Sequence, residues 1–97
     1  MTAPTEVIAE SIGKAMLTEK LIACMNISSG SRSLYVWEGK LCDETEVLCV
    51  MKTRLELFDK LKDRIIELHP YKVPEIIAID IKVASEDYLD WVAEVTI

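Results

Sequence analysis

The sequence has few of the residues that mark several classes of protein. Its 97 residues include three glycines, three prolines, three cysteines and one histidine. The cysteines are odd in number and form no CxxC pair, which favours reduced thiols in a cytosol over a disulfide framework. The chain has no glycine-rich phosphate loop and no evident catalytic triad, so we expect no enzymatic activity.

Charge and hydropathy exclude two further kinds of partner. The 11 basic and 17 acidic side chains give a net charge of −6 without any run of Lys or Arg, which argues against binding to nucleic acid. No apolar stretch approaches the roughly 20 residues that span a bilayer, and no basic-then-apolar signal segment opens the chain. We therefore expect a soluble, cytoplasmic protein with no membrane partner.

Apolar side chains, in contrast, make up 51% of this short chain. A domain of this size buries only about two-thirds of its unfolded surface, so apolar surface should be left over for a partner. The composition predicts an oligomer.

Apolar spacing and capping residues predict three helices, over residues 5–20, 55–68 and 85–95. Thr5 and Ser85 can cap the first and last of them, and a capping-box pattern at 53–56 precedes the second. Pro70 ends the second helix, which places His69 just past its C-terminus.

Strands are predicted at residues 21–27, 32–41, 46–53 and 75–83. The run 28–31 predicts a bend or bulge, and the polar stretch 42–45 predicts the loop of an antiparallel hairpin. Apolar residues occupy both faces of the hairpin strands, and the aliphatic stretch 75–83 is expected to be buried on both faces. Another subunit must therefore cover the second face of the hairpin.

The order of these elements predicts a single α+β domain over residues 1–97. It fits a ferredoxin-like (split βαβ) sandwich with an antiparallel sheet and an additional C-terminal helix, provided that a strand precedes the first helix. Only residues 1–4 are left for that strand. We expect it to be short or missing.

Six runs of sequence, in the same order along essentially the whole chain, resemble the CutA divalent-cation tolerance family. They are TAP at 2–4, EKLIACMN at 19–26, SLYVWEGK at 33–40, EVLCVMKT at 46–53, HPYKVPE at 69–75 and DYLDW at 87–91. The resemblance implies a homotrimer of ferredoxin-like subunits that acts in tolerance of copper or other divalent cations, with no established catalytic activity.

The resemblance also implies where a metal ion would bind. In bacterial members copper is ascribed to a cysteine directly before Thr-Ala-Pro and to two adjacent histidines directly before Pro-Tyr. Met1 and Leu68 occupy two of these positions, which leaves His69 as the candidate metal ligand. No cofactor is expected to be obligatory, and copper or another divalent cation is the candidate ion. The alternative role of His69 is a hydrogen-bonding residue at the helix end.

The resemblance places a mixed set of aromatic and charged residues at a cleft near subunit boundaries. The set consists of Tyr35, Trp37, Glu46, Lys52, Tyr71 and Glu75. Such residues can hold a small ligand or a hard cation. They can equally be structural, with the aromatic rings as packing and interface anchors and Lys52 paired with Glu46 or Glu75 at the interface.

Three functions remain open from the sequence. The first is a trimer that binds metal ions modestly at or near its subunit interfaces and acts in metal-ion tolerance or homeostasis. The second is a non-catalytic structural or interaction scaffold that has lost its metal ligands. The third is a small-molecule sensor that uses the cleft, as the architecturally similar PII signalling proteins do.

Overall fold

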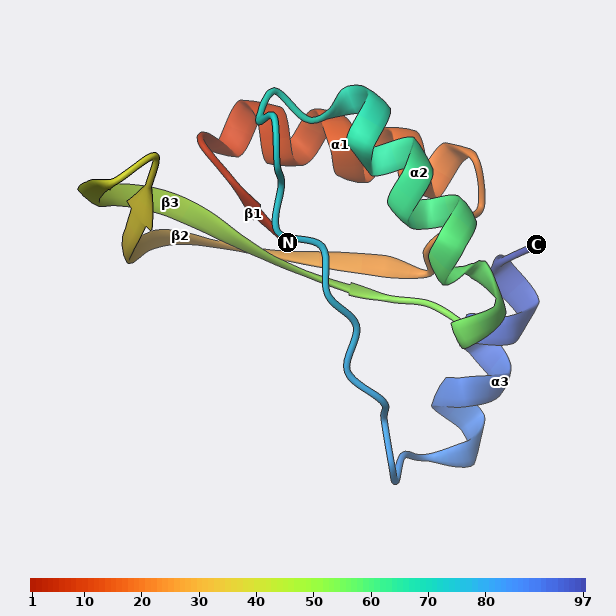
Figure 1. Ribbon diagram of the computed structural model, residues 1–97. Coiled ribbons are helices and arrows are strands. Elements are labelled where there is room, and N and C mark those ends of the chain that lie inside the picture. The colour runs from red at the N-terminus through yellow and green to blue at the C-terminus, as the bar shows by residue number, and fades with distance from the viewer.

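The computed structural model describes all 97 residues as a three-stranded sheet with two helices on one face (Figure 1). The elements, in chain order, are β1 (Thr2–Ala3), α1 (Glu6–Thr18), β2 (Cys24–Trp37), β3 (Lys40–Lys52), the 3-10 turn η1 (Leu55–Leu57), α2 (Phe58–Leu68) and α3 (Glu86–Val95). The sheet is antiparallel, with strand order β1-β3-β2. The α+β, ferredoxin-like prediction is confirmed, and the first strand is indeed short.

All three predicted helices form, and two of them begin at the predicted caps. The Thr5 hydroxyl accepts the Ile8 backbone N–H at 3.2 Å, and the Ser85 hydroxyl accepts the Tyr88 backbone N–H at 3.3 Å. The predicted capping box is wrong. The hydroxyl of Thr53 donates instead to the carbonyl oxygen of Leu21 at 2.6 Å, and α2 follows the 3-10 turn without a side-chain cap.

The hairpin turn lies at Glu38–Gly39, so the predicted loop at 42–45 is wrong. Trp37 pairs with Lys40, and both turn residues have positive φ, 50° at Glu38 and 77° at Gly39. A two-residue connection with positive φ at both positions matches the twist of the flanking strands, and glycine adopts that conformation without steric cost. The polar residues 42–45 therefore continue β3.

The bend predicted at 28–31 is confirmed as an irregularity within β2. The register between β2 and β3 shifts between Ser28 and Ser31, and Gly30 has φ of 79°. Beyond this point the guanidinium of Arg32 holds Asp43 on the neighbouring strand through two hydrogen bonds, at 2.8 and 2.5 Å. This bidentate pair explains how a polar stretch is kept in a strand.

The core lies between the sheet and the two helices above it. Its larger cluster joins α1, α2 and the chain that enters β2, and consists of Ile12, Met16, Leu21, Ile22, Leu61 and Ile65. A smaller cluster of Ala3, Ala9, Val47 and Cys49 packs α1 against β1 and β3. In all, 17 of the 97 residues are buried, so most of the apolar composition remains at the surface of this chain.

The segment 75–83 is extended but pairs with no strand, so the predicted strand is wrong for the isolated chain. In Figure 1 it runs from the loop after α2 past the N-terminus and out beyond the sheet before α3 begins. Apart from Ile76, which packs against the core, its aliphatic side chains are exposed, with 86% of Ile79 and 84% of Val83 accessible to solvent. A strand needs a neighbour to pair with, and β1 offers an edge of only two residues.

We predict that Glu38→Asn stabilises the hairpin. A non-glycine residue with positive φ is strained, and Asn tolerates this conformation better than Glu does. The free energy of unfolding in urea should rise by about 0.5–1 kcal/mol. Glu44→Asn, in the regular part of β3, is the matched control and should not stabilise. A lower stability for Glu38→Asn than for the wild type would contradict this account of the turn.

Candidate functional site

A cleft of about 760 Å³ lies between the outer part of the β2–β3 hairpin and the loop that follows α2. Five of the six predicted cleft residues line it: Tyr35, Trp37, Glu46, Tyr71 and Glu75. Its volume falls within the range of small-molecule sites in proteins.

Strand alternation explains why β2 and β3 contribute to the same wall. Tyr35 and Trp37 are two residues apart, so they point to the same face of β2. The register pairs Tyr35 with Cys42 and Ser31 with Glu46, so the even-numbered residues of this part of β3 share that face. The carboxylate of Glu46 is therefore delivered to the same side of the hairpin as the two aromatic rings.

Glu46 and Tyr71 are joined by a short hydrogen bond across the cleft wall. The Tyr71 hydroxyl donates to Oε2 of Glu46 at 2.6 Å. Glu46 is only 6% exposed, and this hydroxyl is the only donor in the chain that reaches its carboxylate. Burial, and secondarily the hydrogen bond to Glu46, raise the pKa of Tyr71.

His69 connects the loop to the first strand. Its Nδ1 accepts the backbone N–H of Tyr71 at 3.1 Å, so the ring proton lies on Nε2, which donates to the carbonyl oxygen of Thr2 at 2.8 Å. The ring is 7% exposed and packs against Tyr71 with centroids 4.7 Å apart. His69 thereby fixes the position of Tyr71, and through Tyr71 that of Glu46.

The donors of a single chain do not fit a tightly held metal ion. Both ring nitrogens of His69 are engaged, and Met1 is held in the sheet by its ammonium group, which donates to the carbonyl oxygen of Cys49 at 3.0 Å. No three His, Cys, Asp or Glu side chains come together as a group that could hold a metal ion. A metal ion at His69 would have to displace one of its hydrogen bonds.

Lys52 is not among the residues that line the cleft. Its ammonium group donates to the side-chain oxygen of Asn26, so the expected pair with Glu46 or Glu75 is absent from this chain. Six residues of β3 separate Lys52 from Glu46, which is roughly 20 Å at the rise of a strand. Lys52 lines a second, mostly apolar groove of about 820 Å³ between β3, α2 and the segment 75–83.

Glu44 does not line the cleft, but its carboxylate acts on Tyr35, a relation that the sequence analysis did not identify. Burial raises the pKa of Tyr35 to about 12, with a further contribution from the carboxylate of Glu44 and smaller ones from Cys42 and Glu46. The cross-strand register would have identified Glu44, because it pairs with Ser33 on the face that carries Tyr35. A hairpin loop at 42–45, as predicted from the sequence, leaves Glu44 without a cross-strand partner.

The fold and the cleft define the class of protein. The chain is a small ferredoxin-like α+β protein in which a cleft lies between an extended hairpin and the loop after the second long helix. None of its helices combines the length and the apolarity that crossing a membrane requires.

Comparison with known proteins supplies the family. The model of the CutA1 divalent ion tolerance protein matches residues 1–95, and the chain belongs to this family. A divalent-cation tolerance protein CutA from Thermus thermophilus is 45% identical over 99% of this chain and 93% of its own. One from Pyrococcus horikoshii is 50% identical over 91% of this chain and 85% of its own. The solved structure of the Thermus thermophilus protein has a TM-score of 0.94, with 45% identity, over 98% of this chain and 92% of that one.

We predict that the folded protein resists ionisation of its tyrosines. The pKa values of all three are raised, Tyr88 chiefly by its contact with the Cys24 thiol. Absorbance at 295 nm should show little tyrosinate at about pH 10, where the urea-unfolded chain is half-ionised. Because these folded-state pKa values lie above the unfolded one, the contribution of the three tyrosines to stability is complete below about pH 10 and declines at higher pH; that of Tyr35 is lost as the pH rises through about 12.

The variant Tyr35→Phe identifies which ionisation step in the absorbance titration belongs to Tyr35. This variant should lose the ionisation step near pH 12 and leave Tyr88 unchanged, while the pKa of Tyr71, which Tyr35 also raises, should fall slightly. A step near the ordinary value of about 10 in the folded wild-type protein would contradict the geometry of the cleft.

Proposed function

We propose that this chain acts as a non-catalytic homotrimer in divalent-cation tolerance. The observation that carries the proposal is the uncovered apolar surface of the single chain. The segment 75–83 exposes Ile77, Ile79 and Val83, and the outer part of the hairpin exposes Leu34 and Val36. Monomeric proteins rarely leave contiguous apolar surface of this extent in water.

The positions of these surfaces favour a closed ring. β2 is an edge strand of the sheet, and the segment 75–83 is a second extended stretch that pairs with no strand of this chain. Contact between two different surfaces of the same chain is head-to-tail, and such contacts generate rings when the rotation closes. The ring size of three follows from the resemblance to the CutA family.

The role in cation tolerance rests on family membership and on charge. A net charge of −6 raises the local concentration of cations at the surface of the protein. Because the donors of one chain form no tight metal site, we propose modest binding of copper or another divalent cation near the subunit interfaces, with His69 as the candidate ligand.

The chemistry of the cysteines supports a non-catalytic role in the cytoplasm. All three thiols are free, as expected of a reducing compartment. Burial raises the pKa of Cys49, which lowers the fraction of reactive thiolate.

The assembly is tested by placing a charge in the exposed aliphatic segment. We expect Ile79→Asp to dissociate the trimer, because a carboxylate buried between subunits without a partner costs several kcal/mol. Sedimentation velocity at micromolar concentration should show the mass of a trimer for the wild type and a smaller species for the variant. Val7→Asp, an equally exposed site on α1, is the matched control and should stay trimeric. A wild-type protein that sediments as a folded monomer would overturn the proposal.

The role of His69 in cation binding is tested by calorimetric titration with Cu²⁺ and Zn²⁺. We expect dissociation constants no tighter than micromolar for the wild type, and binding about tenfold weaker for His69→Gln. Glutamine can still donate to the carbonyl oxygen of Thr2, so the variant keeps part of the loop anchor. Equal heats for the two proteins would remove His69 from any role in cation binding.

A further inference from the structure

The cleft presents aromatic rings on two of its sides. Tyr35 and Trp37 come from β2, and Tyr71 comes from the loop after α2. Trp37 is 42% exposed, so part of its ring is available to a ligand rather than consumed in packing. Aromatic faces attract cations through the negative face of the ring, and they also bury apolar carbon.

The carboxylate of Glu46 is nearly buried, but only one of its two oxygens accepts a hydrogen bond from the chain. Oε2 accepts the Tyr71 hydroxyl, whereas no donor of the chain reaches Oε1. No buried side-chain oxygen is left sealed without a partner, so Oε1 keeps access to the cleft. A carboxylate oxygen in such a site needs a hydrogen-bond donor, which a bound molecule can supply in place of water.

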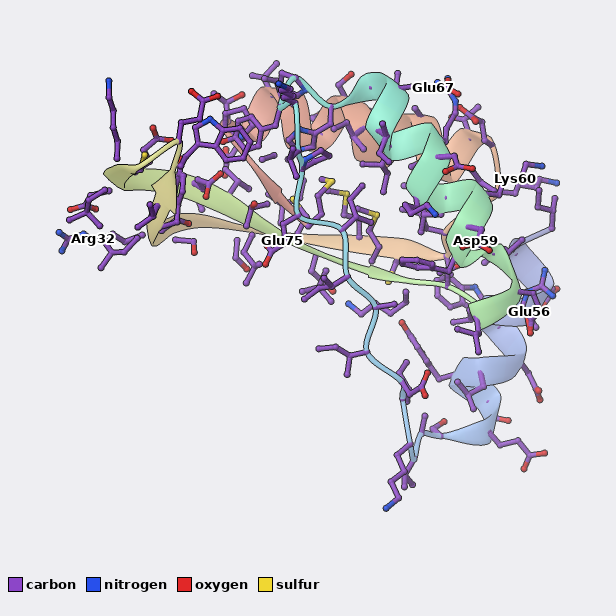
Figure 2. All side chains as sticks on the ribbon, in the orientation of Figure 1. Arg32, Glu56, Asp59, Lys60, Glu67 and Glu75 are labelled. Atoms are coloured by element: carbon purple, nitrogen blue, oxygen red, sulfur yellow. The ribbon has the colours of Figure 1, made fainter.

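The charges around the cleft favour a cation as that molecule. Glu75 is a second carboxylate in the lining. Arg32 is committed to Asp43, and Figure 2 shows it at the outer end of the hairpin while Glu75 lies over the middle of the sheet. Lys72 is the remaining cationic side chain in the lining. Both Lys72 and Glu75 are exposed, whereas Glu46 is 6% exposed, so the buried charge of the cleft is negative.

We propose that this cleft binds a small organic cation with an N–H donor, a primary or secondary amine in its ammonium form. The ammonium group donates to Oε1 of Glu46, and the carbon atoms next to it lie against the rings of Tyr35 and Trp37. A metal ion fits less well, since it requires several fixed donors and the cleft brings no group of three together. The groups assigned to the amine all belong to one chain, and Leu34 of the same lining lies on the hairpin surface that the proposed trimer would cover, so the titration is made on the assembled protein.

The amine site is tested by calorimetric titration with benzylammonium, together with two probes of similar shape. Benzyl alcohol lacks the charge, and benzyltrimethylammonium has the charge but no N–H donor. We expect saturable binding of benzylammonium in the millimolar range or tighter, and binding at least about tenfold weaker for each of the other two. Absence of saturable binding, or equal binding of benzyl alcohol, would overturn the proposal.

Two variants locate the site. Glu46→Gln keeps the shape of the side chain and removes its charge, and should weaken benzylammonium binding by about tenfold. Glu38→Gln, at the exposed hairpin turn, is the matched control and should change the affinity less than about twofold. Trp37→Leu leaves the Glu46–Tyr71 hydrogen bond in place and should also weaken binding, which keeps the test valid if Glu46→Gln folds poorly. Unchanged affinity in folded Glu46→Gln, or in Trp37→Leu, would place the amine elsewhere.

Sedimentation of the same samples keeps this result separate from the proposed assembly. Loss of the trimer with retained amine binding contradicts the proposed function alone. A trimer without amine binding contradicts the cleft proposal alone.

Discussion

The length of β1 is the constraint on which the rest of the structure depends. With two residues, it occupies only Val47 and Leu48 on the edge of β3, and the sheet ends there. The segment 75–83 pairs with no strand of this chain, and an apolar groove lies between it and β3. The same short strand anchors the cleft, because the carbonyl oxygen of Thr2 holds His69. The short strand β1 thus ends the sheet after two pairs with β3 and also holds the loop that carries Tyr71.

The helices could be predicted from the sequence because their signals are local. The hydroxyls of Thr5 and Ser85 cap α1 and α3 by accepting a backbone N–H three residues further along the chain. α2 ends at Leu68, two residues before Pro70, as predicted. The hairpin turn was misplaced because four consecutive polar residues resemble a loop, whereas their retention in β3 depends on Arg32 across the strand pair. The segment 75–83 has the composition of a strand, but pairing is a property of two segments. The sequence of 75–83 alone could not show that no strand of this chain pairs with it.

The sequence predicted most residues of the candidate site, but not the hydrogen bonds that hold them in place. Five of its residues were named and lie around one cleft, but the bond from Tyr71 to Glu46 and the two hydrogen bonds of His69 depend on the loop conformation after α2. The resemblance to the CutA family grouped Lys52 with them, and the structural alternative was a carboxylate partner, because an ammonium within an apolar strand needs one. Its partner is Asn26 on the adjacent strand, a side chain that sequence distance does not reveal.

The proposed assembly follows from the small number of residues that one chain buries. A chain that buries 17 of its 97 residues leaves much apolar surface uncovered, and the proposed trimer would cover part of it at the segment 75–83. Hydrogen exchange of the backbone amides in 75–83 tests this most directly, because within one chain these amides pair with no strand. The account predicts exchange slowed by orders of magnitude relative to an unstructured peptide. Exchange at the unprotected rate in the native protein would contradict it.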